Sequence, residues 1–221
     1  MKKYKIELID KKIAKKLIID NHYSHKWSSC RYALGLILDD VILGVAVYGY
    51  PVGRRVVKSI SPLLENDNVL ELTRLWVHDS EGKNTESYFI GQTFKWLREN
   101  APNISTLISY ADPSYGHVGY IYQATNWLYQ GNNTMLVKAY KHRVLGEWYH
   151  PRSCNAKFGT IKVKTLTDID PNYKREEILK KHRYVYILNK KLKNQIMNTL
   201  KHPVIQYPKS DYNCEWNKKI A

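Results

Sequence analysis

The stretch from Leu70 to Ala111, LELTRLWVHDSEGKNTESYFIGQTFKWLRENAPNISTLISYA, decides the fold. Leu70–Val77 and Thr106–Ala111 are short runs rich in aliphatic residues, which are typical of strands. Between them, apolar residues recur at helical spacing over Ser87–Glu99, which predicts a helix. A strand, a helix and a second strand in this order indicate an α/β sheet.

The segments on either side continue the alternation of strands and helices. The pattern predicts strands at Tyr4–Ile9, Arg31–Leu38, Val41–Tyr48, Thr134–Tyr140 and Tyr184–Leu188, and helices at Lys11–Asp20, Val118–Tyr129 and Asn189–Leu200. This order predicts an α/β (α+β) fold with a mixed central sheet flanked by helices. We expect residues 1–150 to form the catalytic core and residues 151–221 a basic extension that completes the sheet, within one structural domain.

The positive charge of the chain is concentrated toward its C-terminal end. The 221 residues carry 35 Lys and Arg against 20 Asp and Glu, a formal charge of +15. Residues 1–137 hold 16 basic and 13 acidic side chains, whereas residues 138–221 hold 19 and 7. A polyanionic partner such as nucleic acid explains this asymmetry, because a uniform bias would spread the excess. The alternative explanation is an AT-rich genome, which favours Lys, Asn, Ile and Tyr.

Other features of the composition narrow the class of protein. Hydrophobic residues make up 43% of the chain, enough for a substantial core. No apolar run approaches the roughly 18 residues that span a bilayer, and the start lacks the apolar stretch of a signal peptide. Cys30, Cys154 and Cys214 lie far apart and form no CxxC pair. We therefore expect a cytoplasmic protein with reduced thiols and no membrane partner.

The most unusual segment is Ser109–Trp127, SYADPSYGHVGYIYQATNW. A strand ends at Asp112, a turn with Pro and Gly follows, and Tyr122 comes ten residues later. Polar groups at a strand end beside a helix start lie where open α/β sheets bind ligands, and helix-start amides favour an anionic group. Asp112 could instead cap the turn, and the ring of Tyr122 could instead pack under the sheet. Both structural explanations stay open.

Arg74 lies in the middle of an otherwise apolar strand. An arginine is costly to bury there unless its charge is compensated. Glu71 has the opposite strand parity and is therefore a poor direct partner. We expect Arg74 to face a carboxylate, a phosphate or an open cleft, with a structural salt bridge as the alternative.

The loop Asn21–Ser29 is aromatic and basic, and it contains His22 and His25. Histidine titrates near neutrality and serves as an acid, a base or a ligand. The HxxH spacing lacks the carboxylate or Cys companions of a metal site, so we predict no metal. A loop of this composition is suited to stacking an extruded base.

A second loop, Glu81–Ser87, precedes the predicted helix and includes Gly82, Lys83 and Asn84. A loop with glycine that leads into a helix start can cradle a pyrophosphate. Ser87 also suits an ordinary helix cap. The loop is no P-loop, because the Gly-x₄-Gly-Lys-Ser/Thr pattern is missing.

The order of strands and helices resembles that of the GCN5-related N-acetyltransferases (GNAT), with Glu81–Ser87 where that fold holds its pyrophosphate. Several motifs resemble the Mom family of phage adenine-modification proteins more closely. They are His22-Tyr23-Ser24, Leu72-Thr73-Arg74-Leu75-Trp76, Tyr110-Ala111-Asp112, Gly116-His117-Val118-Gly119-Tyr120-Ile121-Tyr122-Gln123-Ala124, Arg183-Tyr184-Val185-Tyr186 and Lys201-His202-Pro203-Val204. The resemblance spans most of the chain and is most specific from Asp112 to Ala124.

The resemblance implies a transferase that converts adenine in phage DNA to N6-(carbamoylmethyl)adenine and so protects the DNA from host restriction. By motif position, it implies catalytic roles for His22, Arg74, Ser87, Asp112 and Tyr122, and donor binding by Gly82, Lys83, Asn84 and Ser87. The partners that it implies are double-stranded DNA and a small-molecule donor, and it leaves a homodimer open. The donor is acetyl-CoA or another acyl or carbamoylmethyl donor.

One departure from the acetyltransferase pattern concerns this donor, because the signature Arg/Gln-x-x-Gly-x-Gly/Ala is not present in the Glu81–Ser87 loop. Two other functions remain as alternatives. An acetyltransferase of a protein or small amine would leave the basic C-terminal third without a role. A non-catalytic DNA-binding module would give no reason for Arg74, Asp112 and Tyr122 in one predicted cleft.

Overall fold

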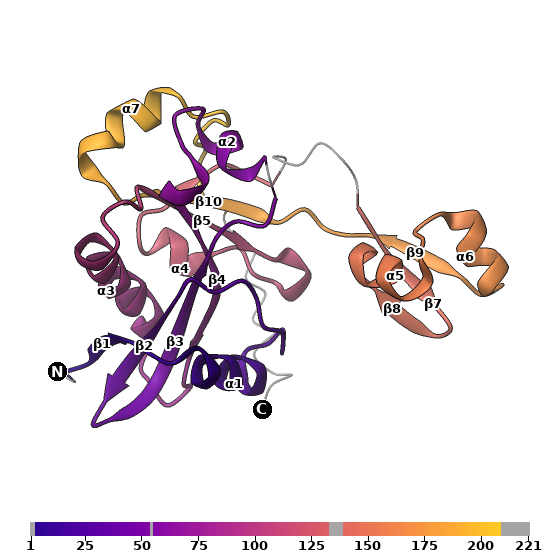
Figure 1. Ribbon diagram of the computed structural model, residues 1–221, viewed down its shortest axis with the longest axis horizontal. Helices are drawn as coiled ribbons and strands as arrows, with labels where there is room; N and C mark the ends of the chain where they lie inside the picture. The colour runs from indigo at the N-terminus through magenta and orange to yellow at the C-terminus, as the bar shows by residue number, and fades with distance from the viewer. Residues whose placement is uncertain (1–2, 54, 133–138, 209–221) are drawn as a thin grey trace.

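The computed structural model describes residues 3–53, 55–132 and 139–208 (Figure 1). Its strands are β1 (Lys5–Leu8), β2 (Tyr32–Leu38), β3 (Val41–Gly49), β4 (Val69–Val77), β5 (Thr106–Ala111), β6 (Leu128–Tyr129), β7 (Tyr140–Val144), β8 (Glu147–Tyr149), β9 (Lys174–Glu177) and β10 (His182–Ile187). Its α-helices are α1 (Lys11–Asn21), α2 (Val56–Ile60), α3 (Thr85–Asn100), α4 (Tyr120–Gln123), α5 (Pro151–Phe158), α6 (Val163–Ile169) and α7 (Lys193–Asn198). Among the described residues, no helix is long and apolar enough to cross a membrane.

The main sheet has seven strands in the order β1-β2-β3-β4-β5-β10-β6. All neighbouring strands are antiparallel except β4 and β5, which run parallel. Helices cover both faces of this mixed sheet (Figure 1). The predicted fold class is therefore confirmed.

The alternating side chains of the strands divide the core into two layers. On one face, Phe89, Phe94 and Leu97 of α3 pack against strand residues such as Leu34 and Leu107. On the other face, α1 packs on β2 and β3, while α2 and α7 pack on β4, β5 and β10. Because successive strand residues point to opposite faces, both layers are apolar and hold the sheet between helices.

Strands β4 and β5 pair over only three residues each, Val69–Glu71 with Thr106–Ile108. Beyond these residues β4 continues to Val77 and β5 to Ala111, yet the two strands no longer form a ladder. The second halves of both strands therefore diverge inside the sheet. This divergence positions the cavity described below.

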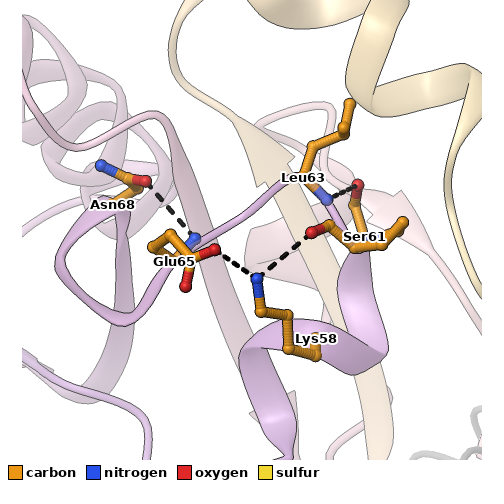
Figure 2. A network of polar contacts seen from close by, with 6 residues as sticks. Lys58, Ser61, Leu63, Glu65 and Asn68 are labelled. Carbon is orange, nitrogen blue, oxygen red and sulfur yellow. Dashed lines mark hydrogen bonds and ion pairs between the residues drawn. The ribbon is translucent and has the colours of Figure 1, made fainter.

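The connection from β3 to β4 is fixed by a polar network (Figure 2). Lys58 of α2 forms an ion pair with Glu65 and donates a hydrogen bond to the Pro62 carbonyl. The Ser61 hydroxyl accepts from the Leu63 amide, and the Asn68 side chain accepts from the Glu65 amide. These contacts hold α2 against the sheet at the point where β4 begins.

Residues 140–177 form a small lobe with its own sheet, in the order β8-β7-β9, and its own helices α5 and α6 (Figure 1). Its core contains Val144, Cys154 and Leu166. The lobe projects from the main sheet and is inserted between β6 and β10, which are neighbours in that sheet. Residue 150 lies inside this lobe, between β8 and α5, and β10, from the C-terminal part of the chain, lies in the main sheet.

Two predicted helices differ from the observed elements. The helix predicted at Val118–Tyr129 is wrong beyond α4, because Asn126 adopts a left-handed φ of 59° and the chain then enters β6. The helix predicted at Asn189–Leu200 is a 3₁₀ turn followed by the shorter α7. Of the strand predicted at Thr134–Tyr140, residues 134–138 lie outside the described residues, and β7 begins at Tyr140.

Candidate active site

A cavity of about 490 Å³ lies where β4 and β5 diverge. Its walls come from four segments, Asn21–Tyr23, Leu72–Val77, Tyr110–Ala111 and Gly116–Tyr122, together with Asp79 and Glu86. His22, Arg74 and Tyr122, predicted from separate parts of the sequence, therefore line one cavity. Asp112 directly follows the lining residue Ala111 at the end of β5.

Arg74 is held at the cavity by carbonyl oxygens. Its Nε donates to the Lys26 carbonyl at 2.8 Å, and its Nη1 donates to the Thr73 carbonyl at 2.6 Å. Within the part of the chain that the structure describes, no carboxylate lies within 4 Å of the guanidinium. Burial lowers the pKa of Arg74. A half-buried cation without an ion-pair partner favours an anionic ligand over a structural salt bridge.

His22 is buried beside Arg74, and its pKa is lowered to about 4 by burial and by the charges of Arg74 and two other histidines. The imidazole is therefore neutral at pH 7. The Ser24 backbone amide lies 3.1 Å from Nδ1 and can only donate, so Nδ1 is the acceptor. The remaining proton of the neutral ring is then on Nε2. His22 consequently offers a hydrogen-bond donor at the cavity rather than a positive charge.

Tyr122 packs its ring among Trp127 and Tyr184, with ring centroids 5.2 and 5.0 Å away. Its hydroxyl lies 2.7 Å from the Ser109 hydroxyl, which lies 2.8 Å from the Leu72 carbonyl. Because a carbonyl only accepts, Ser109 donates to Leu72 and Tyr122 donates to Ser109. Ser109 thereby bridges the diverging strands. Burial raises the pKa of Tyr122, so its phenol is neutral and both structural and chemical roles are open to it.

Asp112 caps the 3₁₀ turn Pro113–Tyr115 by accepting from the Ser114 amide at 3.0 Å, and it forms an ion pair with Lys181 at 2.9 Å. Burial pushes the pKa of Asp112 up, but Lys181 and Ser114 outweigh burial and hold the pKa below its usual value. The carboxylate is therefore ionised at neutral pH. Lys181 belongs to the connection between the lobe and β10, far from Asp112 in the chain, so no sequence pattern indicates this pair.

The Glu81–Ser87 loop leads into α3, where Asn84 precedes the first turn with a left-handed φ of 71°. The Ser87 hydroxyl donates to the Asn84 carbonyl at 2.9 Å, so Ser87 lies inside the first turn and is not the cap. Gly82 and Lys83 are exposed, and a Cβ at Gly82 would meet no atom within 4 Å. Only Glu86 of this segment lines the cavity. Ser87 follows the lining residue Glu86 in the chain but does not itself line the cavity. Gly82, Lys83 and Asn84 do not line it either.

Exposed aromatic rings gather at the cavity; Tyr23 belongs to the loop expected to stack a base, whereas Tyr115 and Tyr120 come from the segment after β5. The Tyr23 ring lies 4.7 Å from that of Tyr115 and 4.9 Å from that of His117. Tyr23 is 46% exposed and Tyr120 45% exposed, although both line the cavity. Burial lowers the pKa of His117 against the opposing charge of Asp112. The recurrence of aromatic residues through Tyr115–Tyr122 was the available signal for this cluster.

Comparison with known proteins shows the family of the chain. The model of the Mom protein family matches residues 3–209. The chain belongs to the Mom protein family. A relative in this family, the methylcarbamoylase mom of Escherichia phage Mu, is 33% identical over 218 residues, which cover 94% of this chain and 85% of that protein.

Solved structures that resemble this Mom-family chain are GNAT acetyltransferases. YhbS from Escherichia coli, in complex with CoA, has 11% identity and a TM-score of 0.41, and the match covers 57% of this chain and 69% of that chain. An acetyltransferase from Streptococcus pneumoniae has 8% identity and a TM-score of 0.46, and the match covers 85% of this chain and all of that chain. The likeness concerns the arrangement of strands and helices alone.

Proposed function

We propose that this protein transfers a carbamoylmethyl group to N6 of adenine in double-stranded phage DNA and thereby shields the DNA from restriction in the host cytoplasm. The observation that carries the proposal is the cavity between β4 and β5, which joins an arginine without a carboxylate partner to a rim of exposed aromatic rings. An anionic small molecule suits the first feature, and a nucleobase suits the second. Membership of the Mom family supports the same assignment.

The donor side of the proposed site consists of Arg74, His22 and the start of α3. Arg74 supplies a positive charge, and the neutral His22 supplies an N–H. The amides of Glu86 and Ser87 lie in the first turn of α3, where helical amides have no intrahelical acceptor. Such groups hold an anionic part of the donor. A carbamoylmethyl donor balances the transfer, because its CH₂–N6 bond forms as its bond to an anionic leaving group breaks beside Arg74. The acetyl group of acetyl-CoA carries no amide nitrogen and would need a second, nitrogen-bearing donor. Gly82, Lys83 and Asn84 lie further out and would contact only an extended donor.

The acceptor side consists of Asp112, Tyr122 and the aromatic rim. An adenine inside the duplex is out of reach, so the base must leave the stack and enter the cavity. The ionised Asp112 accepts the proton that the N6 amino group loses, while Tyr122 orients the amino group through its hydroxyl oxygen. Tyr23 and Tyr120 stack on the extruded base.

The test separates chemistry from binding. Asp112→Ala and Tyr122→Phe should abolish adenine modification of plasmid DNA in expressing cells, while gel-shift assays show DNA binding as strong as that of the wild type. Ser114→Ala, which keeps the Asp112 carboxylate and leaves the Ser114 amide in place, should retain modification. Loss of DNA binding in the Asp112 and Tyr122 variants would contradict the assigned roles. Acetylation of amines without DNA would instead favour an ordinary acetyltransferase.

A further inference from the structure

The lobe formed by residues 140–177 has no part in the cavity walls and carries eight Lys and Arg against five Asp and Glu. Residues 140–181, the lobe and its return connection, carry ten Lys and Arg against five Asp and Glu. We infer that this lobe is a docking surface for duplex DNA that holds the phosphates beside the cavity. This inference rests on the proposed function and names the surface by which that function reaches its substrate.

The lobe carries cations that its own fold does not neutralise. Lys141 pairs with Glu176, and Lys157 pairs with Glu147. The other cations of the lobe form no ion pair among the described residues; they are Arg143, Arg152, Lys162, Lys164, Lys174 and Arg175. All but Arg143 are exposed. A surface of this kind is electrostatically complementary to the phosphate backbone of DNA.

The lobe is anchored next to the mouth of the cavity. Its residue His150, the cap of α5, lies close enough to Arg152, Lys181 and Lys26 for their charges to lower its pKa, in addition to burial. Lys181 pairs with Asp112, and the Lys26 carbonyl holds Arg74. The return connection of the lobe therefore brings one cation, Lys181, to the Asp112 side of the candidate active site. Phosphates that flank an extruded nucleotide need cations at this place.

The tip of the β7–β8 hairpin exposes a leucine in a two-residue turn, Leu145–Gly146, in which both residues have a positive φ. Leu145 is 64% exposed and adopts a left-handed φ of 52°, a conformation that is unfavourable for a leucine. Its amide is fixed by the Asp170 carboxylate at 2.7 Å. Trp148 on the next strand is 41% exposed, with the Lys141 ammonium 4.6 Å from the centre of its ring. An apolar side chain flanked by cations is what DNA-bending proteins insert between base steps.

A second basic patch on the described surface is the rival docking site. Lys190, Lys191 and Lys193 are exposed at the start of α7, which lies at a different end of the molecule from the lobe (Figure 1). Among the described residues, no ion pair joins Lys190, Lys191 or Lys193 to the candidate site, whereas Lys181 of the lobe's return connection pairs with Asp112. It therefore supplies a control of equal charge.

The experiment measures the affinity of the full-length protein for a fluorescent 20–30 base-pair duplex as a function of salt. In Lys162→Gln/Lys164→Gln/Lys174→Gln, binding at low salt should fall by at least about tenfold, and the slope of log K against log salt should fall by about two to three. Lys190→Gln/Lys191→Gln/Lys193→Gln should bind like the wild type. Melting temperatures check that both variants are folded.

Leu145→Gly gives a test that does not depend on charge. Glycine relieves the left-handed backbone, so the melting temperature should stay equal or rise, while DNA modification in cells falls at least about fivefold. A lobe variant that binds and modifies DNA like the wild type would overturn the inference and leave the proposed function standing. Loss of binding in the α7 variant alone would move the docking surface there. A wild-type protein that binds DNA through the lobe without modifying it would contradict the proposed function and leave the docking surface standing.

Discussion

At the scale of a single residue, the free-energy cost of burying the charge of Arg74 indicates that the residue has a function. Its guanidinium is half-buried and donates to two carbonyl oxygens, and no carboxylate of the described residues lies within 4 Å, although the charge of Glu71 acts on it from further away. Such a side chain adds little to stability, because the loss of hydration offsets the hydrogen bonds that it gains. Its retention is therefore best explained by a ligand.

Arg74→Met should accordingly abolish DNA modification while changing the free energy of unfolding by less than about 1 kcal/mol. Urea denaturation and nucleoside analysis check the two effects. Arg98→Met is the matched control, since Arg98 donates to the Leu188 carbonyl and the Tyr186 hydroxyl in the core. That variant should lose about 1–3 kcal/mol and still modify DNA. Modification by Arg74→Met at the wild-type rate would remove Arg74 from the site.

His22 predicts a dependence of stability on pH. Its pKa in the folded protein, about 4, lies below the value of 6.5 of an ordinary histidine. The unfolded chain therefore binds the proton more readily, and the contribution of His22 is fully present above pH 6.5 and lost as the pH falls toward 4. In His22→Asn, which keeps an acceptor for the Ser24 amide, the fall in unfolding free energy between pH 6.5 and 4 should be smaller. An equal fall in both proteins would show that His22 is not buried as a neutral ring.

At this scale the sequence predicted part of the candidate site. Arg74 was predictable because a cation in an apolar strand is costly. Glu71 forms no ion pair with Arg74 among the described residues, but the register shift of β4 between Leu72 and Arg74 breaks the strand parity, and the charge of Glu71 acts on Arg74. The Asp112–Lys181 pair was not predictable, because it joins residues that lie far apart in the chain and depends on how the lobe returns to the sheet. The roles of Ser87, Asp112 and Tyr122 stay predictions until variants are measured.

At the scale of elements, the turn between β5 and α4 sets the shape of the cavity. Gly116 and Gly119 both have positive φ, 70° and 87°. A Cβ at Gly116 would meet no atom within 4 Å, whereas a Cβ at Gly119 would lie 2.5 Å from the ring of Tyr184. The two glycines are thus alike in backbone conformation and different in packing.

Gly119→Ala should therefore destabilise the protein by about 2–4 kcal/mol, from backbone strain and from displacement of the Tyr184 ring. Gly116→Ala carries the backbone cost alone, about 1–2 kcal/mol. Thermal or urea unfolding of both variants gives the comparison. Equal losses in the two variants would mean that the Tyr184 ring does not pack on this turn.

The predicted elements were most accurate where the apolar pattern is strong. β4, α3 and β5 match their predicted ranges within two residues at each end, because their apolar faces are buried in the core. The elements of the lobe were largely missed, since they are short and mostly exposed; all four residues of β9 face solvent. The long helix predicted after Val118 failed because left-handed residues and a return into β6 interrupt a helical pattern.

At the scale of the whole molecule, the lobe interrupts the chain between two neighbouring strands of the main sheet. The insertion leaves the core intact, and its return connection brings Lys181 to Asp112 at the candidate site. The net charge of the chain predicted a polyanionic partner. How the basic residues are distributed among the lobe, its return connection and α7 could be determined only from the structure. The proposed activity joins the anionic donor site, the aromatic rim and the basic surface of the lobe.

The most direct measurement is nucleoside mass spectrometry of plasmid DNA from cells that express the protein, beside cells that express Arg74→Met at the same soluble level. The proposed function predicts a carbamoylmethyl derivative of deoxyadenosine with the wild-type protein only. DNA that stays unmodified while the wild-type protein is folded and abundant would contradict the proposed function.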